Sequence, residues 1–294
     1  MEDILEFYYD ITNLKIEKYK DYYIIKDLFD TYLLEELLYD KETLKKNIDI
    51  LNNTNILYHL LILTKDGNMT FSYDGKEYVF LKIRENVNKT VSIFDFNEFK
   101  VNGTFNWGEL WSKRIDYYET QVEEVIKDES VKYSLQYYIG LSENAISMFN
   151  DLNELYDNNL ITFGLSHHKL EVPLNVINFY DPVNIFVDND VRDLSEYIKT
   201  VFFEENLTNS EILTLVDKIN FTEVSANYFL DRLLYPSYFF KVYDDYIESK
   251  NLDKKIFLII KKSPEFEMLL KQIYSRLIYK YNIKINSWIF KSQH

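Results

Sequence analysis

The first third of the chain alternates between short apolar runs and turn signals, a pattern typical of β-strands. The runs are rich in Tyr, Ile and Leu, and two Asp-Gly dipeptides interrupt them at 66–67 and 74–75. Asp-Gly favours the tight turns of β-hairpins, because glycine adopts positive φ at little cost. The pattern predicts a β-meander, with strands at 22–27, 31–38, 58–63, 71–73 and 77–83.

One segment of this third has helical periodicity instead. Leu44, Ile48 and Leu51 recur at the spacing of a single helix face between Asp40 and Leu51. We therefore expect one amphipathic helix among the strands.

Beyond about residue 100, apolar residues recur every three or four positions. Helices are predicted from Trp107 through a charged stretch to Glu129, and at 137–155, 193–203, 238–250 and 266–281. The segment 174–187 is strand-like but interrupted by proline. A strand-rich third followed by a helical remainder indicates an α+β protein of two packed lobes.

Composition narrows the possible functions. The 294 residues carry 33 basic and 48 acidic side chains, a net charge of −15, which disfavours binding to nucleic acid or to an anionic membrane surface. The 26 Tyr and 21 Phe are expected mostly in the core. The chain has no cysteine, no apolar run of the roughly 20 residues that a membrane span needs, and an acidic start unlike a signal peptide. We expect a cytoplasmic protein.

Several catalytic motifs are absent. The six glycines form neither GxGxxG nor GxxxxGK[ST], so the usual backbone cradles for phosphate are missing. There is no HExxH, and four histidines without cysteine make a transition-metal site a poor expectation. One dense polar segment remains, Ser166–Leu170 followed by Asp181, Asp188, Asp190 and Asp193. Taken alone, these residues leave the site unassigned, because such groups more often form turns and caps.

The order of several segments gives a more specific indication. Together they resemble the CotS/YutH spore-coat kinase-like proteins, which are similar to aminoglycoside and choline phosphotransferases. The matching segments are 65–84 for the second half of an N-lobe, 107–119 and 137–146 for two C-lobe helices, 167–170 for an HGDL-like catalytic loop, and 191–198 for the RDL helix that follows.

The resemblance implies a protein-kinase-like two-lobed α+β fold. Its strand-rich N-lobe would span residues 1–83. Its mainly helical C-lobe would span 84–294 and carry a degenerate catalytic loop at 166–193.

Phosphoryl transfer in such folds needs a strand lysine for the nucleotide phosphates, an aspartate for the acceptor hydroxyl, and Asp or Asn for Mg²⁺. The matching strand offers Glu35 and Glu36, and the loop reads His167-His168-Lys169, with Lys169 in place of the aspartate. The resemblance assigns the remaining roles as follows: Asp181 to the metal, Asn175 or Asn178 to its second ligand, Lys82 and Ile83 to a nucleotide hinge, and His167 and Asp193 to structural support of the loop.

These exchanges favour a pseudokinase, a scaffold or ligand-binding module that holds a protein partner or small ligand in spore-coat or envelope assembly. The alternative is an active small-molecule phosphotransferase that uses ATP, Mg²⁺ and Asp181, with Lys169 clamping the terminal phosphate. A third interpretation is an unrelated α+β binding module.

Overall fold

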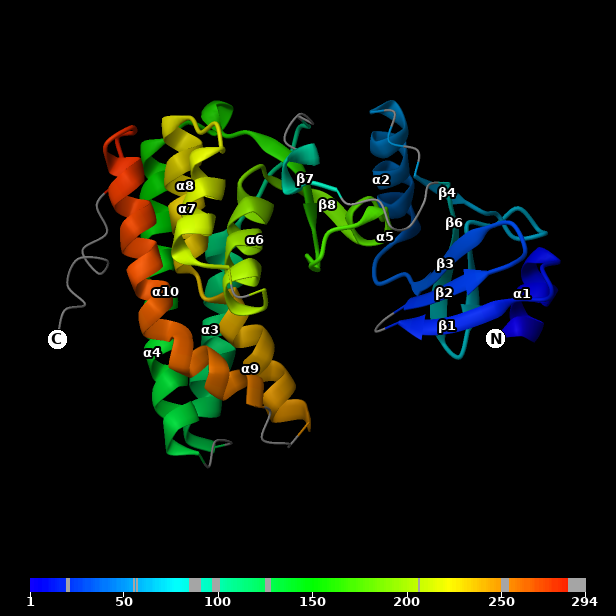
Figure 1. The fold of residues 1–294 in the computed structure, drawn as a ribbon, viewed down its shortest axis with the longest axis horizontal. Helices are drawn as coiled ribbons and strands as arrows, with labels where there is room; N and C mark the ends of the chain where they lie inside the picture. Colours follow the sequence, from blue (N-terminus) through cyan, green and yellow to red (C-terminus); the bar gives the residue numbers. More distant parts are fainter. Residues whose placement is uncertain are drawn as a thin grey trace. The chain divides into compact units, whose positions relative to one another are not determined.

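A computed structural model describes residues 1–19, 22–54, 56, 58–84, 91–96, 101–124, 128–205, 207–249 and 254–284 (Figure 1). The chain forms two compact units. Unit 1 consists of Met1–Phe99 and His167–Phe186, and unit 2 of Lys100–Ser166 and Val187–His294. The lobe ranges expected from the sequence assigned all of 166–193 to the second lobe. The structure instead groups 167–186 with the N-terminal residues, because side chains of the N-terminal part bind the backbone at 182–185.

Unit 1 is built on a six-stranded sheet. Its described elements are α1 (Glu2–Tyr9), β1 (Lys15–Tyr19), β2 (Tyr22–Lys26), β3 (Thr31–Glu36), α2 (Lys41–Asn53), β4 (His59–Leu61), β5 (Thr70–Tyr73), β6 (Lys76–Ile83), the 3-10 helix η1 (Ile93–Phe96) and α5 (Val176–Phe179). Strands β7 (Phe163–His167) and β8 (Ile185–Asn189) pair with each other, and the boundary between the units falls within both.

The strand order of the sheet is β1-β2-β3-β6-β4, with β5 also paired to β6. The predicted β-meander is therefore wrong in order, although its strands exist. The reason is the length of β6: its first half pairs with β5 and its second half with β4, while β3 pairs along its other side. The expected Asp74-Gly75 hairpin joins β5 to β6, with both residues at positive φ (50° and 75°).

One face of the sheet forms a small core with α1, which the sequence did not predict. Leu5 of α1 is fully buried with Tyr32 and Leu34 of β3 and Phe80 of β6. The amide of Lys65 donates to the Tyr8 carbonyl at 2.8 Å and so fixes the end of this helix. Alternation along β3 sends Leu33 and Glu35 to the opposite face.

Helix α2 agrees with the predicted helix to within two residues at each end. Its first residues are capped by Asp40, whose carboxylate accepts from the Thr43 amide at 2.8 Å. The buried residues are Leu44, Asn47 and Leu51, whereas Ile48 is only partly buried. A polar residue thus occupies the middle of the face that the apolar pattern assigned to the core.

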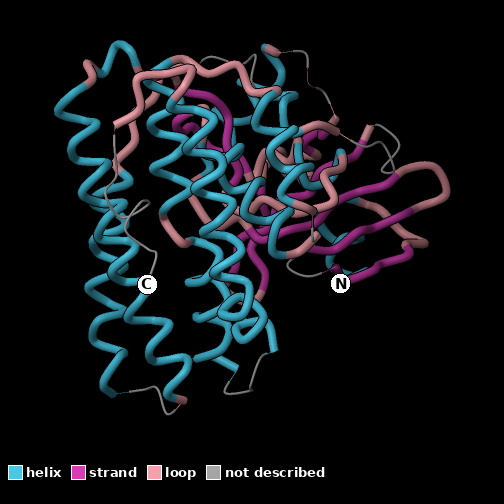
Figure 2. The backbone as a smooth tube through the Cα atoms, turned by 60° about the vertical axis from the view of Figure 1, so that its left-hand side comes forward, coloured by secondary structure: helices cyan, strands magenta, loops and turns pink. Residues whose placement is uncertain are grey.

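Unit 2 is mainly helical among its described residues (Figures 1 and 2). Its helices are α3 (Trp107–Glu124), α4 (Glu129–Leu155), the 3-10 helix η2 (Asn158–Leu160), α6 (Arg192–Phe203), α7 (Asn209–Asp217), α8 (Glu223–Leu234), α9 (Ser237–Ser249) and α10 (Lys254–Ile278). Two predicted helices were too short: α4 begins at Glu129 because Asp128 caps it, and α10 continues through Pro264. None of the described helices is long and apolar enough to cross a membrane.

The predicted strand at 174–187 is only partly present. Residues 176–179 form α5 instead, because Asn175 and Asn178 make a reciprocal capping box. Only the end of the segment enters strand β8.

A buried ion cluster links α6 to α8 and α9 within unit 2. The Glu196 carboxylate accepts from Lys199 Nζ at 2.9 Å, from Arg232 Nε at 2.7 Å and from the Ser237 hydroxyl at 2.7 Å. Although burial opposes ionisation, the neighbouring cations hold the pKa of Glu196 far below its usual value. Burial lowers the pKa of Lys199 to about 8. The partly buried carboxylate of Glu196 is therefore matched by cations.

Helix α8 begins with a capping box in which the Thr222 hydroxyl accepts from the Ser225 amide at 3.1 Å. We expect Thr222→Ala to lower the free energy of unfolding by about 1 kcal/mol, because it exposes an unpaired amide at the helix start. Thr214→Ala, on an exposed position of α7, is the matched control and should change stability little. Urea unfolding of both variants measures the difference, and equal values would contradict the capping role.

Candidate functional site

The candidate loop joins β7 to β8 and is stabilised by Asn184. The Asn184 side chain accepts from the Lys169 amide at 2.9 Å and donates to the Lys169 carbonyl at 2.8 Å. Its own carbonyl accepts from the His168 amide at 2.7 Å. The sequence analysis did not single out this asparagine, although its position directly before strand β8 was a usable signal. Asn184 fixes the backbone on which His168 and Lys169 lie.

The two asparagines proposed as a second metal ligand have another role in the structure. Asn175 Oδ1 accepts from the amides of Ile177 and Asn178, and Asn178 Oδ1 accepts from the Asn175 amide at 3.0 Å. Both side chains therefore hold the first turn of α5. Their metal role stays a prediction, and the capping bonds would compete with it.

His167 is buried at the end of β7 against aromatic rings. Its Nε2 lies 2.8 Å from the Phe179 carbonyl oxygen and donates its proton to it, and its ring stacks on Phe96 with centroids 5.4 Å apart. The resemblance implies a backbone hydrogen bond for His167, and its role in supporting the loop stays a prediction. The neighbouring His168 is exposed and stacks on Phe186 at 4.3 Å.

The central feature of the site is a carboxyl pair formed by Glu35 of β3 and Asp181, which follows α5. The two carboxyl groups interact with each other, Asp181 also accepts from the Val183 amide at 2.9 Å, and Glu35 Oε1 is buried without a hydrogen-bond partner among the described residues. Glu35 is 9% exposed and Asp181 5%. Glu36, the next residue of β3, instead pairs with Lys76 at 2.6 Å. Of the two strand glutamates, Glu35 thus faces the predicted metal aspartate.

Burial governs the ionisation of this pair. Burial, and then the charge of Asp181 and the hydrogen bond to it, raise the pKa of Glu35 well above its usual value. Burial also raises the pKa of Asp181, which the hydrogen bond from Glu35 partly offsets. Two carboxylates in contact cannot both ionise cheaply. Burial and the repulsion between the two groups therefore favour one retained proton, on Glu35, and a single negative charge on the pair.

Two further side chains close the site around this pair. Asn47 Nδ2 of α2 donates to the carbonyls of Pro182, at 3.0 Å, and Ile185, at 2.7 Å. The Tyr39 hydroxyl donates to the carbonyls of Pro182 and Val183, at 2.8 and 2.6 Å. The segment 182–185 is thereby bound to α2 and to Tyr39, which lies between β3 and α2. Sequence reasoning missed both residues, and a polar residue on an apolar helix face was the available signal for Asn47.

Lys169 is not paired with the carboxyl pair. Its Nζ lies 3.6 Å from Glu171 Oε1, and its side chain is 41% exposed. The structure thus brings Glu35 and Asp181 together, and the cation of Lys169 interacts with a different carboxylate.

The hinge residues Lys82 and Ile83 lie inside the sheet. Lys82 is in register with Tyr32 on one side and Leu60 on the other, and its Nζ contacts Asp30 Oδ2 at 2.5 Å. The next amide, of Arg84, donates to the Tyr58 carbonyl at 2.8 Å. Residues 85–90 lie outside the described residues, so the hinge role stays a prediction.

Asp193, assigned to support the loop, lies in unit 2 on α6. Its carboxylate accepts from Arg192 at 3.0 Å, while Arg192 Nε lies 3.2 Å from Asp188. Asp188 also accepts from the Trp107 indole at 3.0 Å. The tether from Asp193 to the loop stays a prediction.

Within the described residues, no three His, Asp or Glu side chains form a group that could hold a metal ion.

The strand order, the long helices and the polar loop between β7 and β8 define a protein with the kinase-like phosphotransferase fold. Solved structures support this class. The chain is similar to an aminoglycoside phosphotransferase from Alicyclobacillus acidocaldarius, with a TM-score of 0.62 and 8% identity, over 90% of this chain and 92% of that one. It is also similar to spectinomycin phosphotransferase APH(9)-Ia, with a TM-score of 0.55 and 14% identity, over 92% of each chain. At these identities the likeness establishes the fold.

Sequence comparison gives the family. Residues 2–273 match the family described as "Spore coat putative kinase YutH", and the chain belongs to this family. It is 29% identical over 230 residues to the endospore coat-associated protein YutH of Bacillus subtilis, which covers 67% of each chain. The expected family and the α+β kinase-like fold are therefore confirmed.

The raised pKa values of the carboxyl pair predict a pH-dependent stability. Consider a carboxyl group whose pKa is higher in the folded state than in the unfolded state. Its contribution to the stability of the fold is complete below the pKa of the unfolded state and is lost as pH rises through the pKa of the folded state. The free energy of unfolding should therefore fall as pH rises above about 4.5, the ordinary value for Glu35. Glu35→Gln keeps a donor toward Asp181 and should remove roughly 1–3 kcal/mol of this fall.

Chemical unfolding between acid and mildly alkaline pH measures this effect. Glu36→Gln on the same strand is the matched control, because Glu36 pairs with Lys76 away from Asp181. Parallel profiles for wild type and Glu35→Gln would show that the pair does not control stability.

The two backbone bonds of Asn47 predict a second effect on stability. Asn47→Ala should cost about 1–3 kcal/mol, because it removes the side-chain donor to the buried Ile185 carbonyl and leaves the Pro182 carbonyl with Tyr39 as its side-chain donor. Asn52→Ala, exposed on the same helix, should change stability little. Thermal and urea unfolding compare the two variants, and equal losses would contradict the bridging role.

Proposed function

We propose that the protein is a non-catalytic, kinase-fold member of the YutH family that acts as a scaffold or ligand-binding module in spore-coat assembly. We expect it to act in the cytoplasm or in the spore that forms there. The similarity to an endospore coat-associated protein supports the setting. The main support for a non-catalytic protein is the buried contact of Glu35 with Asp181.

The first part of the argument concerns the nucleotide phosphates. Kinase-like phosphoryl transfer needs a lysine on a sheet strand to hold them. The matching strand offers Glu35 and Glu36 at that position, and Glu35 is the one that contacts Asp181. A second acid at this position adds no positive charge, and any ionisation would repel the triphosphate.

The second part concerns the metal. A Mg²⁺ ion binds through ionised carboxylate oxygens and usually keeps several waters. Asp181 is 5% exposed, receives the Val183 amide and contacts Glu35, so metal binding would have to break bonds that stabilise the loop. The carbonyls that follow it are bound by Asn47 and Tyr39. These contacts make Asp181 a poor ligand for Mg²⁺.

The third part concerns the acceptor. The general base of a kinase is an aspartate that accepts a hydroxyl proton. Lys169 occupies the matching position, and an ammonium group cannot accept a proton. Its interaction with Glu171 supports the charged form.

A thermal-shift assay with ATP and Mg²⁺ tests the proposal. A ligand that binds the native state raises its melting temperature. We expect no shift for wild type at roughly millimolar nucleotide, and no release of phosphate from ATP above a protein-free control. Asp181→Asn should behave in the same way as wild type with respect to nucleotide.

The opposite result would identify an active small-molecule phosphotransferase, the alternative function. In that case ATP and Mg²⁺ would raise the melting temperature of wild type and of the control Asp66→Asn, which changes an exposed turn. The shift would disappear in Asp181→Asn. Either this pattern or steady ATP turnover would refute the non-catalytic proposal.

A further inference from the structure

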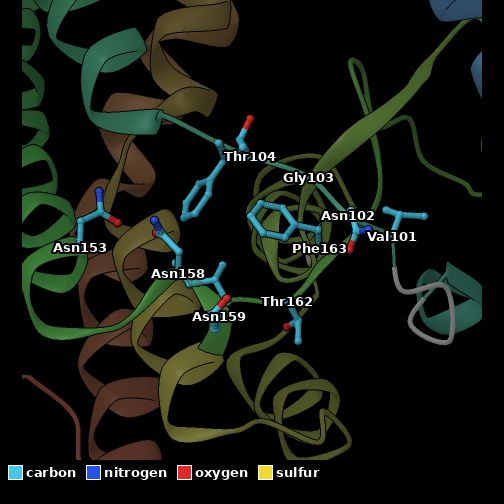
Figure 3. Close-up of a pocket in the computed structure, with 11 residues that line it drawn as sticks. Val101, Asn102, Gly103, Thr104, Asn153, Asn158, Asn159, Thr162 and Phe163 are labelled. Carbon is cyan, nitrogen blue, oxygen red and sulfur yellow. The ribbon is translucent and has the colours of Figure 1, made fainter.

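A pocket of about 700 Å³ lies entirely within unit 2, away from the residues of the carboxyl pair in the sequence (Figure 3). It is formed by the segment 101–105, the end of α4, η2 and the start of β7. Its volume is within the range of small-molecule sites, about 300–1,000 Å³. Neither the family nor the phosphoryl-transfer chemistry assigns a role to it.

At Gly103, the backbone that forms one wall of the pocket lies close to the side chains of Val187 and Phe163. A Cβ atom at this position would lie 2.6 Å from Val187 Cγ1 and 2.9 Å from Phe163 Cδ1, so only glycine fits without movement. The neighbouring amide of Val101 donates to the Phe163 carbonyl at 3.2 Å. The segment 101–105 is thereby held against the two strands, which indicates a preformed pocket.

The polar lining consists of uncharged side chains. Four asparagines, Asn102, Asn153, Asn158 and Asn159, contribute to it together with two threonines. The Tyr228 hydroxyl donates to Asn153 Oδ1 at 2.8 Å, which orients this amide. The side chains of Asn102, Asn158 and Asn159 make no hydrogen bond to other described residues. Each carboxamide therefore offers two donors and an acceptor to a ligand.

Aromatic rings supply the apolar part. Phe105 and Phe163 have centroids 5.7 Å apart at an interplanar angle of 73°. Figure 3 shows the Phe163 ring between Asn102 on one side and Asn158 and Asn159 on the other. A ligand in this pocket would meet ring surface and carboxamides at the same time.

We infer that this pocket binds a neutral saccharide. Sugar hydroxyls both donate and accept hydrogen bonds and so match carboxamides, whereas the CH faces of a pyranose ring match phenylalanine. A charged ligand fits poorly, because none of the described lining side chains carries a charge to pair with it. The site is independent of the proposed non-catalytic function, since it lies wholly in unit 2.

The test uses maltose, cellobiose and di-N-acetylchitobiose as neutral probes, titrated into the full chain by NMR or calorimetry. Saturable binding of at least one probe is expected, with a Kd of about 0.1–10 mM. Asn102→Ala and Asn158→Ala should each weaken it about three- to tenfold. The matched control Asn52→Ala lies on an exposed position of α2 and should leave binding unchanged. Glucosamine and glucuronate serve as charged probes.

Two results would overturn the inference. One is the absence of saturable binding for all three neutral disaccharides. The other is a probe affinity of Asn102→Ala and Asn158→Ala that equals the affinity of the control Asn52→Ala. Tighter binding of a charged probe, with the same dependence on Asn102 and Asn158, would also refute a neutral ligand. Circular dichroism of each variant shows that a loss of binding does not come from unfolding.

Discussion

A buried carboxyl group must either keep its proton or be matched by a cation, and this constraint distinguishes two polar clusters among the described residues. In unit 2, Glu196 is ionised because Lys199 and Arg232 contact it. In unit 1, Glu35 has a second acid, Asp181, beside it, and burial together with this acid favours a retained proton. The chain thus places two cations beside Glu196 and a second acid beside Glu35.

The carboxyl pair depends on contacts that close the loop around it. Asn47 and Tyr39 bind the backbone carbonyls after Asp181, and Asn184 binds both backbone groups of Lys169. Side-chain amides and a phenol thereby satisfy polar groups in a loop that a working phosphotransferase would direct toward nucleotide and metal. Several backbone carbonyls of the loop are therefore already bound by side chains of unit 1.

Local patterns predicted much of the fold. The Asp74-Gly75 hairpin, α2 and the order of strand-rich and helical parts could be read from the sequence, because they depend on neighbouring residues. The order β3-β6-β4 could not, since pairing between distant strands depends on the length of β6. Helix α1 was missed because it is short and has no side-chain cap. The capping boxes at Thr208 and Thr222 were usable signals for α7 and α8.

By itself, the sequence determined which chemical groups are present: glutamates on the strand where the resemblance implies a lysine, Lys169 in the loop, and the ordered segments that indicated the family. Only the tertiary structure decided that Glu35 faces Asp181 while Glu36 pairs with Lys76, and that Asn47 reaches the carbonyls of Pro182 and Ile185. The physical reason is that periodicity assigns a side chain to a face of its own element. Which distant residue contacts that face depends on packing. Packing therefore also decides which carboxyl groups come into contact and compete for a proton.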